Sequence, residues 1–223
     1  MSSSLRLKKI GTHFYTYSLV PGQRVYGEKI VKEKSENWIG GEWREWNPFR
    51  SKLCAALQSG LEEFPIHEGN SVLYLGSAEG TTVSHVSDIV GDAGAVIGVD
   101  ISPHVMGKFS KLVETRENII PILGDANQPQ TYEKELDGMK FDVIVQDIAQ
   151  KNQAEIFSKN WSVFAHAKTH GLLVIKSKSV DFTKPPEQVL TAELKELQRK
   201  HIKVRQIVSL EKYEKSHFLI HIQ

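Results

Sequence analysis

The sequence has few of the features that mark secreted, disulfide-bonded or membrane-spanning proteins. Cys54 is the sole cysteine in 223 residues, which excludes an intrachain disulfide and fits a reducing compartment. No run of 18 apolar residues occurs and the N-terminus lacks an apolar signal region, so neither a transmembrane helix nor a signal peptide is predicted. No C-x-x-C motif and no His/Cys cluster at zinc spacing is present. We therefore expect a cytoplasmic protein without a metal and without a membrane partner.

Excess charge of one sign is also missing. The chain has 28 Lys+Arg against 27 Asp+Glu, a formal net charge of +1, which argues against a nucleic-acid binder held by bulk positive charge. The charges are unevenly distributed, however. Residues 1–52 hold ten basic and five acidic side chains, residues 53–150 hold five and 15, and residues 151–223 hold 13 and seven. Such asymmetry indicates binding partners for particular parts of the chain.

The first 50 residues predict a small antiparallel β domain. Aromatic and β-branched residues fill the segments 12–20 and 25–31, and Pro21-Gly22 supplies a turn between them. Trp43 and Trp46 follow, and we interpret them as packing anchors between the two parts of the chain rather than as ligand platforms.

Residues 51–223 predict a second, α/β domain. Short apolar strands alternate with helical patterns, and the chain closes with an antiparallel pair. Strands are expected at 72–75, 95–100, 119–123, 141–147, 172–176, 203–210 and 217–222, and helices at about 51–61, 82–90, 105–114, 152–164 and 186–200. Continuous apolar strands indicate a mostly parallel sheet covered on both faces. The pattern is compatible with a Rossmann-like class I methyltransferase sheet whose last strand is antiparallel.

A glycine-rich turn directly after the first of these strands indicates a ligand site. Gly76 permits a tight turn from strand to helix, and the backbone there can approach a ligand closely. Ser77 and Ala78 interrupt the dinucleotide pattern G-x-G-x-x-G, which argues against NAD.

Three aspartates at successive strand ends add to this indication. Asp100 is placed to accept both hydroxyls of a ribose, Asp125 to accept from an adenine amino group, and Asp147 ends the fourth strand. Each one alone is equally well explained as the cap of a turn or helix. Together they favour S-adenosylmethionine, whose sulfonium and amino groups are cationic.

Four segments resemble the fibrillarin family, the methyltransferases of box C/D ribonucleoprotein particles. They are Trp46-Asn-Pro-Phe-Arg-Ser-Lys-Leu, residues 72–91 with the Thr81-Thr-Val-Ser-His-Val-Ser-Asp stretch, residues 118–127, and Asp147-Ile-Ala-Gln. The resemblance covers nearly the whole chain. Because the Gly/Arg-rich N-terminal extension of eukaryotic members is absent, the chain resembles the archaeal form of the family.

Carried over by motif, the resemblance implies site residues. For S-adenosylmethionine it implies Gly76, Ser77, Thr81, Thr82, Asp100, Ile101, Asp125, Ala126, Asp147 and Gln150. For the reaction centre it implies the tetrad Lys52, Asp147, Lys176 and His217. The chain departs from the family's usual residues at four positions. Glu79 replaces a small residue and Asp100 replaces a Glu. Ile101 stands where an aromatic residue is often found, and Lys178 stands where Arg is often found.

The implied activity is methyl transfer to a ribose 2′-hydroxyl of rRNA, with tRNA as a further substrate. The leaving thioether is neutral, so the protein must align the hydroxyl and help remove one proton. Lysine is a poor base at its ordinary pKa of about 10.4, and burial or a nearby cation makes it a better one. We hypothesise that Lys176 accepts the proton, Asp147 orients it, and Lys52 and His217 tune the charge and position the ribose.

The resemblance implies partners as well: a Nop-domain scaffold protein, a kink-turn-binding ribosomal-protein homologue, a box C/D guide RNA and the target RNA. Two alternatives remain open at this point. One is a standalone S-adenosylmethionine-dependent enzyme acting on another substrate, including protein glutamine. The other is a non-catalytic assembly subunit, against which the intact tetrad argues.

Overall fold

The computed structural model describes residues 6–32 and 41–223, which form a small sheet, a large sheet and the helices that cover them. The small sheet contains β1 (Leu7–Ile10), β2 (His13–Tyr17), β3 (Ile30–Lys32) and β4 (Glu42–Trp46). The large sheet contains β5 (Ser71–Leu75), β6 (Ala95–Asp100), β7 (Ile119–Leu123), β8 (Val143–Gln146), β9 (His170–Lys176), β10 (Val204–Ser209) and β11 (His217–Ile222). The helices are α1 (Lys52–Gln58), α2 (Thr81–Val90), α3 (Pro103–Val113), α4 (Gln130–Glu133), α5 (Gln153–Phe164), α6 (Ser177–Val180) and α7 (Pro186–Arg199).

The large sheet has the strand order β10-β11-β9-β8-β5-β6-β7. Strands β5 to β9 are parallel, and β11 runs antiparallel to both of its neighbours. The chain winds outward from β5 in both directions, so the strand order reverses between β5 and β8. Ligands of open α/β sheets bind at such a switch point, outside the carboxyl ends of the strands. The predicted fold class is confirmed, including the antiparallel last strand.

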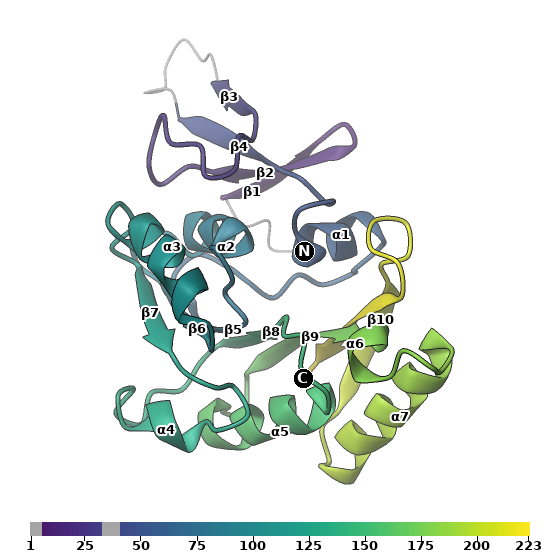
Figure 1. Ribbon diagram of the computed structural model, residues 1–223. Coiled ribbons are helices and arrows are strands. Elements are labelled where there is room, and N and C mark those ends of the chain that lie inside the picture. The colour runs from purple at the N-terminus through teal and green to yellow at the C-terminus, as the bar shows by residue number, and fades with distance from the viewer. Residues whose placement is uncertain (1–5, 33–40) are drawn as a thin grey trace.

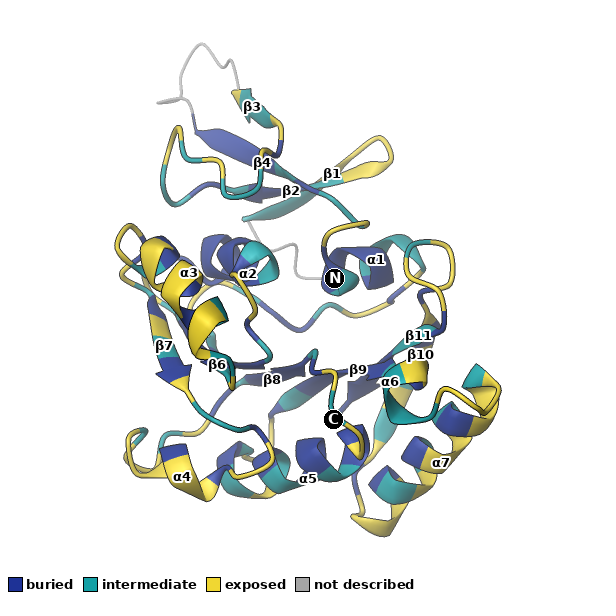
Figure 2. Cartoon of the chain, in the orientation of Figure 1, coloured by how far each residue is buried: buried dark blue, intermediate teal, exposed yellow. Residues whose placement is uncertain are grey.

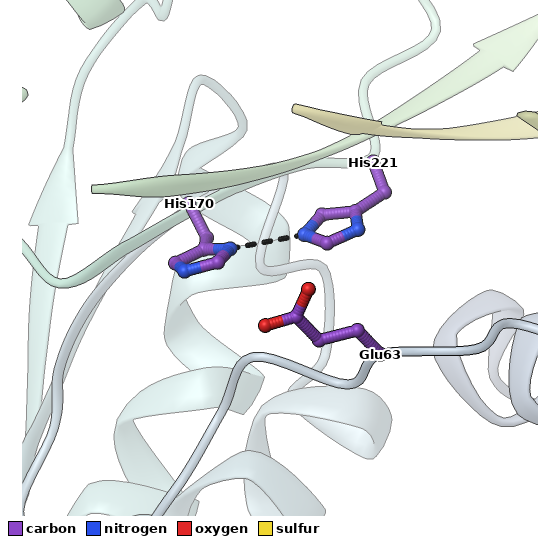
Figure 3. A group of neighbouring side chains, drawn as sticks. All are labelled: Glu63, His170 and His221. Carbon is purple, nitrogen blue, oxygen red and sulfur yellow. Dashed lines mark hydrogen bonds between the residues drawn. The ribbon is translucent and has the colours of Figure 1, made fainter. Parts of the chain in front are cut away.

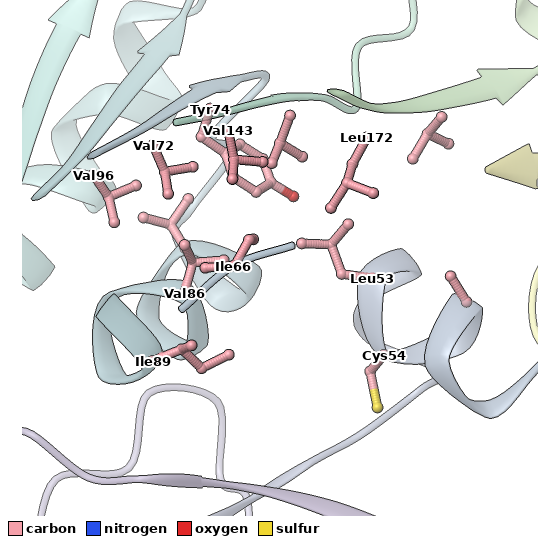
Figure 4. Packing of buried hydrophobic residues seen from close by; sticks show 14 of the residues in the cluster. Leu53, Cys54, Ile66, Val72, Tyr74, Val86, Ile89, Val96, Val143 and Leu172 are labelled. Carbon is pink, nitrogen blue, oxygen red and sulfur yellow. The ribbon is translucent and has the colours of Figure 1, made fainter. Parts of the chain in front are cut away.

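The molecule is layered, with the large sheet between two sets of helices (Figure 1). Helices α1, α2 and α3 lie on the side that faces the small sheet, and α4, α5 and α7 lie on the other side. Alternating strand residues pack into two buried clusters, one on each face of the large sheet. In the first cluster Leu53 of α1 and Val86 of α2 pack beneath Val72 and Leu172 of the strands (Figure 4).

Burial follows the same layers (Figure 2). The central strands are buried except at some of their end residues, whereas the outer faces of α3, α4 and α7 are exposed. Among the described residues no helix contains a stretch long and apolar enough to cross a bilayer. Helices α4 and α6, with four residues each, were not predicted because so short a segment shows no helical periodicity.

The small sheet is antiparallel, as the sequence predicts, in the order β1-β2-β4-β3. Its predicted second segment, 25–31, is largely a loop, because only Ile30–Lys32 pairs with β4. The two tryptophans lie on β4. Trp46 is fully buried and its ring stacks on His85 of α2 with centroids 5.2 Å apart, so it anchors the small sheet to the α/β part. Trp43 packs edge-on against Tyr17 within the small sheet.

A buried ionic cluster reinforces this contact. Asp88 of α2 accepts from Arg44 of β4 through Oδ2 and from Arg116 through Oδ1, each at 2.7 Å, and all three side chains are fully buried. Glu28 pairs with the other side of Arg44 at 2.6 Å. We call these four residues the interface cluster. The predicted boundary at residue 50 lies between β4 and α1, and the division into two domains stays a prediction.

Candidate active site

The loop between β5 and α2 is shaped by two glycines. Gly76 has φ +85°, and a Cβ built on it would lie 2.7 Å from the carbonyl oxygen of Asp147, so no other residue fits. Gly80 has φ +92°, and its Cβ would lie within 3 Å of Leu112 and Phe109. Strand β5 is thereby joined to α2 by a turn that lies close to the carboxyl end of β8.

A cavity of about 350 Å³ opens on one side of this loop. Of the residues predicted to contact the cofactor or the reacting atoms, Lys52, Gly76, Ser77, Thr81, Thr82 and Asp147 line it. The hydroxyl oxygen of Ser77 is buried and has no hydrogen-bond partner among the described residues. The first turn of α2 also lacks a side-chain cap. The cavity therefore offers hydrogen-bonding groups that the protein itself does not satisfy.

A second cavity, of about 390 Å³, lies on the other side of the loop. Of the predicted residues, Gly76, Asp100, Ile101, Ala126, Asp147, Gln150 and Lys176 line it. Asp100 accepts from the amide of Ala78 through Oδ2 and from the amide of Ser102 through Oδ1, each at 3.0 Å. Since each carboxylate oxygen can accept more than one hydrogen bond, Asp100 both shapes the loop and keeps capacity for a ligand.

Asp125 does not line either cavity. Its Oδ1 accepts from the side-chain amide of Gln150 at 3.0 Å and from the backbone amide of Asn127 at 2.9 Å. Asp125 therefore holds Gln150, which lines the second cavity, and caps its own turn. The capping interpretation of a strand-end aspartate applies in part to both Asp125 and Asp100.

Asp147 lies where the two cavities meet, and two lysines converge on it. Lys52 Nζ lies 3.3 Å from Oδ2, and Lys176 Nζ lies 2.8 Å from Oδ1. The Lys176 contact to Oδ1 is an ion pair without hydrogen-bond alignment, because the directed bond of its Nζ goes to the carbonyl oxygen of Asp147 at 2.9 Å. Side-chain exposure is 14% for Asp147, 17% for Lys176 and 22% for Lys52, so all three reach the cavity surface.

The fold explains how Lys52 and Lys176 meet Asp147, although they lie 95 and 29 positions from it in the sequence. Asp147 and Lys176 stand at the carboxyl ends of the adjacent parallel strands β8 and β9, and Lys52 is the first residue of α1. His217 begins β11 and is opposite Lys176 in the strand register. Its Nδ1 lies 2.7 Å from the carbonyl oxygen of Lys215, and within the described residues its side chain forms no hydrogen bond or ion pair with Asp147 or with either lysine. The structure thus brings three of the four predicted residues together and places His217 beside them.

Several residues at the first cavity were not predicted. They include Phe49, Arg50, Tyr74, Ala78 and Glu214. Phe49 is 65% exposed and meets the ring of Tyr213 edge-on, with centroids 5.2 Å apart. Its place three residues before Lys52 in the Asn-Pro-Phe-Arg-Ser-Lys segment was the signal available in the sequence.

The departure at Glu79 has a simple outcome. Its carboxylate pairs with Lys108 of α3 at 2.5 Å, and both side chains are more than half exposed. This hydrogen bond and the charge of Lys108 lower the pKa of Glu79. The additional carboxylate therefore lines the first cavity and is engaged there by Lys108. Ile101 is 57% exposed at the second cavity, in keeping with a position that offers an apolar face to a ligand.

Comparison with known proteins places these features in one family. The Fibrillarin family model matches residues 4–223. The fibrillarin-like rRNA/tRNA 2′-O-methyltransferase of Pyrococcus abyssi is 48% identical over 204 residues, which are 92% of this chain and 86% of that protein. Among solved structures, Aeropyrum pernix fibrillarin in complex with natively bound S-adenosyl-L-methionine is 41% identical, with a TM-score of 0.85 over 95% of this chain and 89% of that one. A fibrillarin/Nop5p complex is 37% identical, with a TM-score of 0.84 over 97% and 96%. The chain therefore belongs to the fibrillarin family.

Proposed function

We propose that this chain is an S-adenosylmethionine-dependent methyltransferase that modifies ribose 2′-hydroxyls of rRNA and tRNA. The observation that carries the proposal is the group of Asp147, Lys52 and Lys176 at the junction of the two cavities. One cavity is large enough to hold the amino-acid part of the cofactor and the other its adenosine. The similar Pyrococcus abyssi protein bears the name of this activity.

The residues present fit the cofactor. Ser77 offers a buried hydroxyl without a partner, and the Gly76 turn leaves the space that a Cβ would fill. Asp100 retains acceptor capacity for ribose hydroxyls at the second cavity. The similar Aeropyrum pernix protein was solved with this cofactor bound. When bound, S-adenosylmethionine supplies an electrophilic methyl carbon on a positively charged sulfur.

The side chains of this protein must position the reacting groups and take up the hydroxyl proton. The ribose oxygen attacks the methyl carbon, the neutral thioether leaves, and the hydroxyl proton must be taken up. Lys176 Nζ is held by the carbonyl and carboxylate oxygens of Asp147, which fixes its position at the second cavity. In its amine form it has the lone pair to accept that proton. Asp147 positions Lys176, and Lys52 places a second cation on the same carboxylate.

The RNA and protein partners follow from the family. A similar protein was solved in complex with Nop5p, which supports a Nop-domain scaffold protein as the partner of this chain. We further propose that a kink-turn-binding ribosomal-protein homologue and a box C/D guide RNA complete the particle. Guide-RNA pairing then selects the target, which agrees with a net charge of only +1.

The test is transfer of labelled methyl from S-adenosylmethionine to a target RNA, with guide RNA and partner proteins supplied or left out singly. We expect transfer only with the full set, at the nucleotide that the guide specifies. Transfer to RNA or protein glutamine by the chain alone would support a standalone enzyme and contradict the guided role. Bound cofactor without transfer under any combination would identify a non-catalytic subunit.

A further inference from the structure

Two histidines meet at the edge of the large sheet opposite the cofactor cavities. His170 begins β9, and His221 lies near the end of the antiparallel neighbour β11, opposite Leu172. Because side chains alternate along a strand, His170, Leu172 and His221 share one face of the sheet. The two imidazole rings stack with centroids 5.3 Å apart, and Nδ1 of His170 lies 3.0 Å from Nε2 of His221 (Figure 3).

A carboxylate faces this pair from a different part of the chain. Glu63 lies on the segment between α1 and β5, and its side chain points toward both rings (Figure 3). One nitrogen of each histidine and one oxygen of Glu63 all lie within 4.8 Å of one another. In a tetrahedral zinc site, with bonds of about 2.0–2.2 Å, ligand atoms stand roughly 3.3 Å apart. Glu63 is exposed, so its side chain is free to move inward over that difference.

The surroundings support a cation here. His67, on the same segment as Glu63, has a buried Nδ1 without a hydrogen-bond partner among the described residues.

We propose that Glu63, His170 and His221 bind one divalent transition-metal ion of the zinc class. Two imidazole nitrogens and a carboxylate suit Zn²⁺, whereas Mg²⁺ and Ca²⁺ prefer oxygen ligands alone. The ion fastens the Glu63 segment to strands β9 and β11, and His67, on the same segment as Glu63, is the candidate fourth ligand. Because His170 and Lys176 stand at opposite ends of β9, roughly 20 Å apart at 3.3 Å per residue, the role is structural.

Sequence spacing does not predict this site. His170 and His221 are 51 positions apart, and Glu63 lies more than 100 positions before either one. The expectation that the chain contains no metal rested on spacing within short segments. The antiparallel pairing of β11 with β9 is what places the two rings side by side.

The test uses the full chain, freed of any purification tag, stripped with EDTA and dialysed. Titration with ZnCl₂ should give one site per chain with a Kd below about 10 µM, and thermal unfolding should shift upward when Zn²⁺ is added. Substitution of Co²⁺ should produce the visible absorption of a tetrahedral ion with nitrogen and oxygen ligands, which reports coordination directly.

Three variants locate the site. Loss of one ligand in His170→Gln or Glu63→Gln should weaken Zn²⁺ binding by at least about tenfold and remove the thermal shift. His166→Gln is the matched control, since His166 is an exposed histidine that faces a single carboxylate, Asp142, at 3.7 Å. It should bind Zn²⁺ as the unchanged protein does. The proposal is overturned if the stripped protein binds no stoichiometric Zn²⁺, or if folded Glu63→Gln and His170→Gln bind it with unchanged affinity.

Discussion

Two sites in this molecule each centre on an aspartate held between two cations, one site buried and the other partly open to solvent. In the interface cluster, Asp88 lies between Arg44 and Arg116, with both contacts at 2.7 Å and no exposed side-chain surface. In the reaction centre, Asp147 lies between Lys52 and Lys176, at 3.3 and 2.8 Å, with each side chain partly exposed. Each carboxylate thus holds two cations, one on each oxygen.

The difference lies in the cations and in their access to solvent. Arginine keeps its proton at any physiological pH and forms several directed bonds, which suits a permanent buried link between β4, α2 and the residues after α3. Lysine can lose its proton, which suits a group that must accept one. Arginine therefore serves the packing of the two sheets, while lysine at a cavity surface serves chemistry.

The largest expected effect comes from removing the central charge at each site. Asp88→Asn leaves the buried Arg116 without a charged partner and Arg44 with Glu28 alone, which should lower the free energy of unfolding by about 3 kcal/mol or more. Asp147→Asn should lower it by about 1 kcal/mol or less and reduce methyl transfer by about 100-fold or more. Urea denaturation and methyl-transfer rates measure the two effects. Equal losses of stability in the two variants would contradict the distinction.

The second prediction separates the charge of Lys176 from its proton. Lys176→Arg retains a cation beside Asp147 but cannot supply a neutral amine, so methyl transfer should fall by about 100-fold or more, as in Lys176→Ala. Cofactor binding should persist in Lys176→Arg. Lys195→Ala, on the exposed face of α7, is the control and should keep the rate of the unchanged protein. Full activity of the arginine variant would show that Lys176 acts through its charge alone.

The third prediction concerns the pH dependence of stability and His85, which is acted on by the charges of Arg44 and Arg116 in the interface cluster. His85 is fully buried, with Nδ1 2.8 Å from the hydroxyl of Thr16 and Nε2 2.8 Å from the hydroxyl of Tyr26. Burial, followed by the charges of Arg44 and Arg116, lowers the pKa of His85 well below 6.5. The unfolded chain then binds more protons below pH 6.5 than the folded one, so stability should fall as the pH drops through that range.

For one such histidine the slope approaches about 1.4 kcal/mol per pH unit. Burial lowers the pKa of His170 and His221 too, so they add slopes of the same sign. His85→Gln should therefore reduce the slope between pH 6.5 and 5.5 without abolishing it, whatever its effect on absolute stability. Denaturation curves across this range measure the slope, and an unchanged slope would contradict the assignment to His85.

The smallest effect is expected at a pair that is more than half exposed. Glu79 and Lys108 face solvent, where water screens their attraction, so Glu79→Gln should change cofactor affinity by less than about twofold. Calorimetric titration with S-adenosylmethionine measures this affinity. A larger change would mean that the Glu79 carboxylate contacts the cofactor when it is bound. The departure of this chain from the family's usual small residue would then have a functional role.

The large sheet was predictable because its strands are continuous apolar runs separated by helical patterns and glycine turns. Residues 95–100 were predicted as a strand, and the structure has the same bounds. In the small sheet the length of β3 was overestimated. The segment 25–31 shows β propensity, but propensity does not show which of its residues pair with another strand. Strand β4 escaped prediction because Trp43 and Trp46 were interpreted only as packing residues.

The residues of the candidate site also differ in whether the sequence could predict them. Gly76, Asp100 and Asp147 have local signals, since a turn glycine and strand-end acids can be recognised beside their own strands. Phe49 has a signal only in the segment that it shares with Lys52. Glu214 has none, since it reaches the first cavity only through the packing of the turn before β11.

The sequence by itself determined the order of the strands along the chain, the position of the glycine turn and the family. The tertiary structure alone decided which distant side chains meet. It brought Lys52 and Lys176 to Asp147, buried Arg44 and Arg116 around Asp88, and joined His170 to His221. The physical reason is that periodicity records local conformation and burial, whereas these contacts depend on strand register and on the packing of layers.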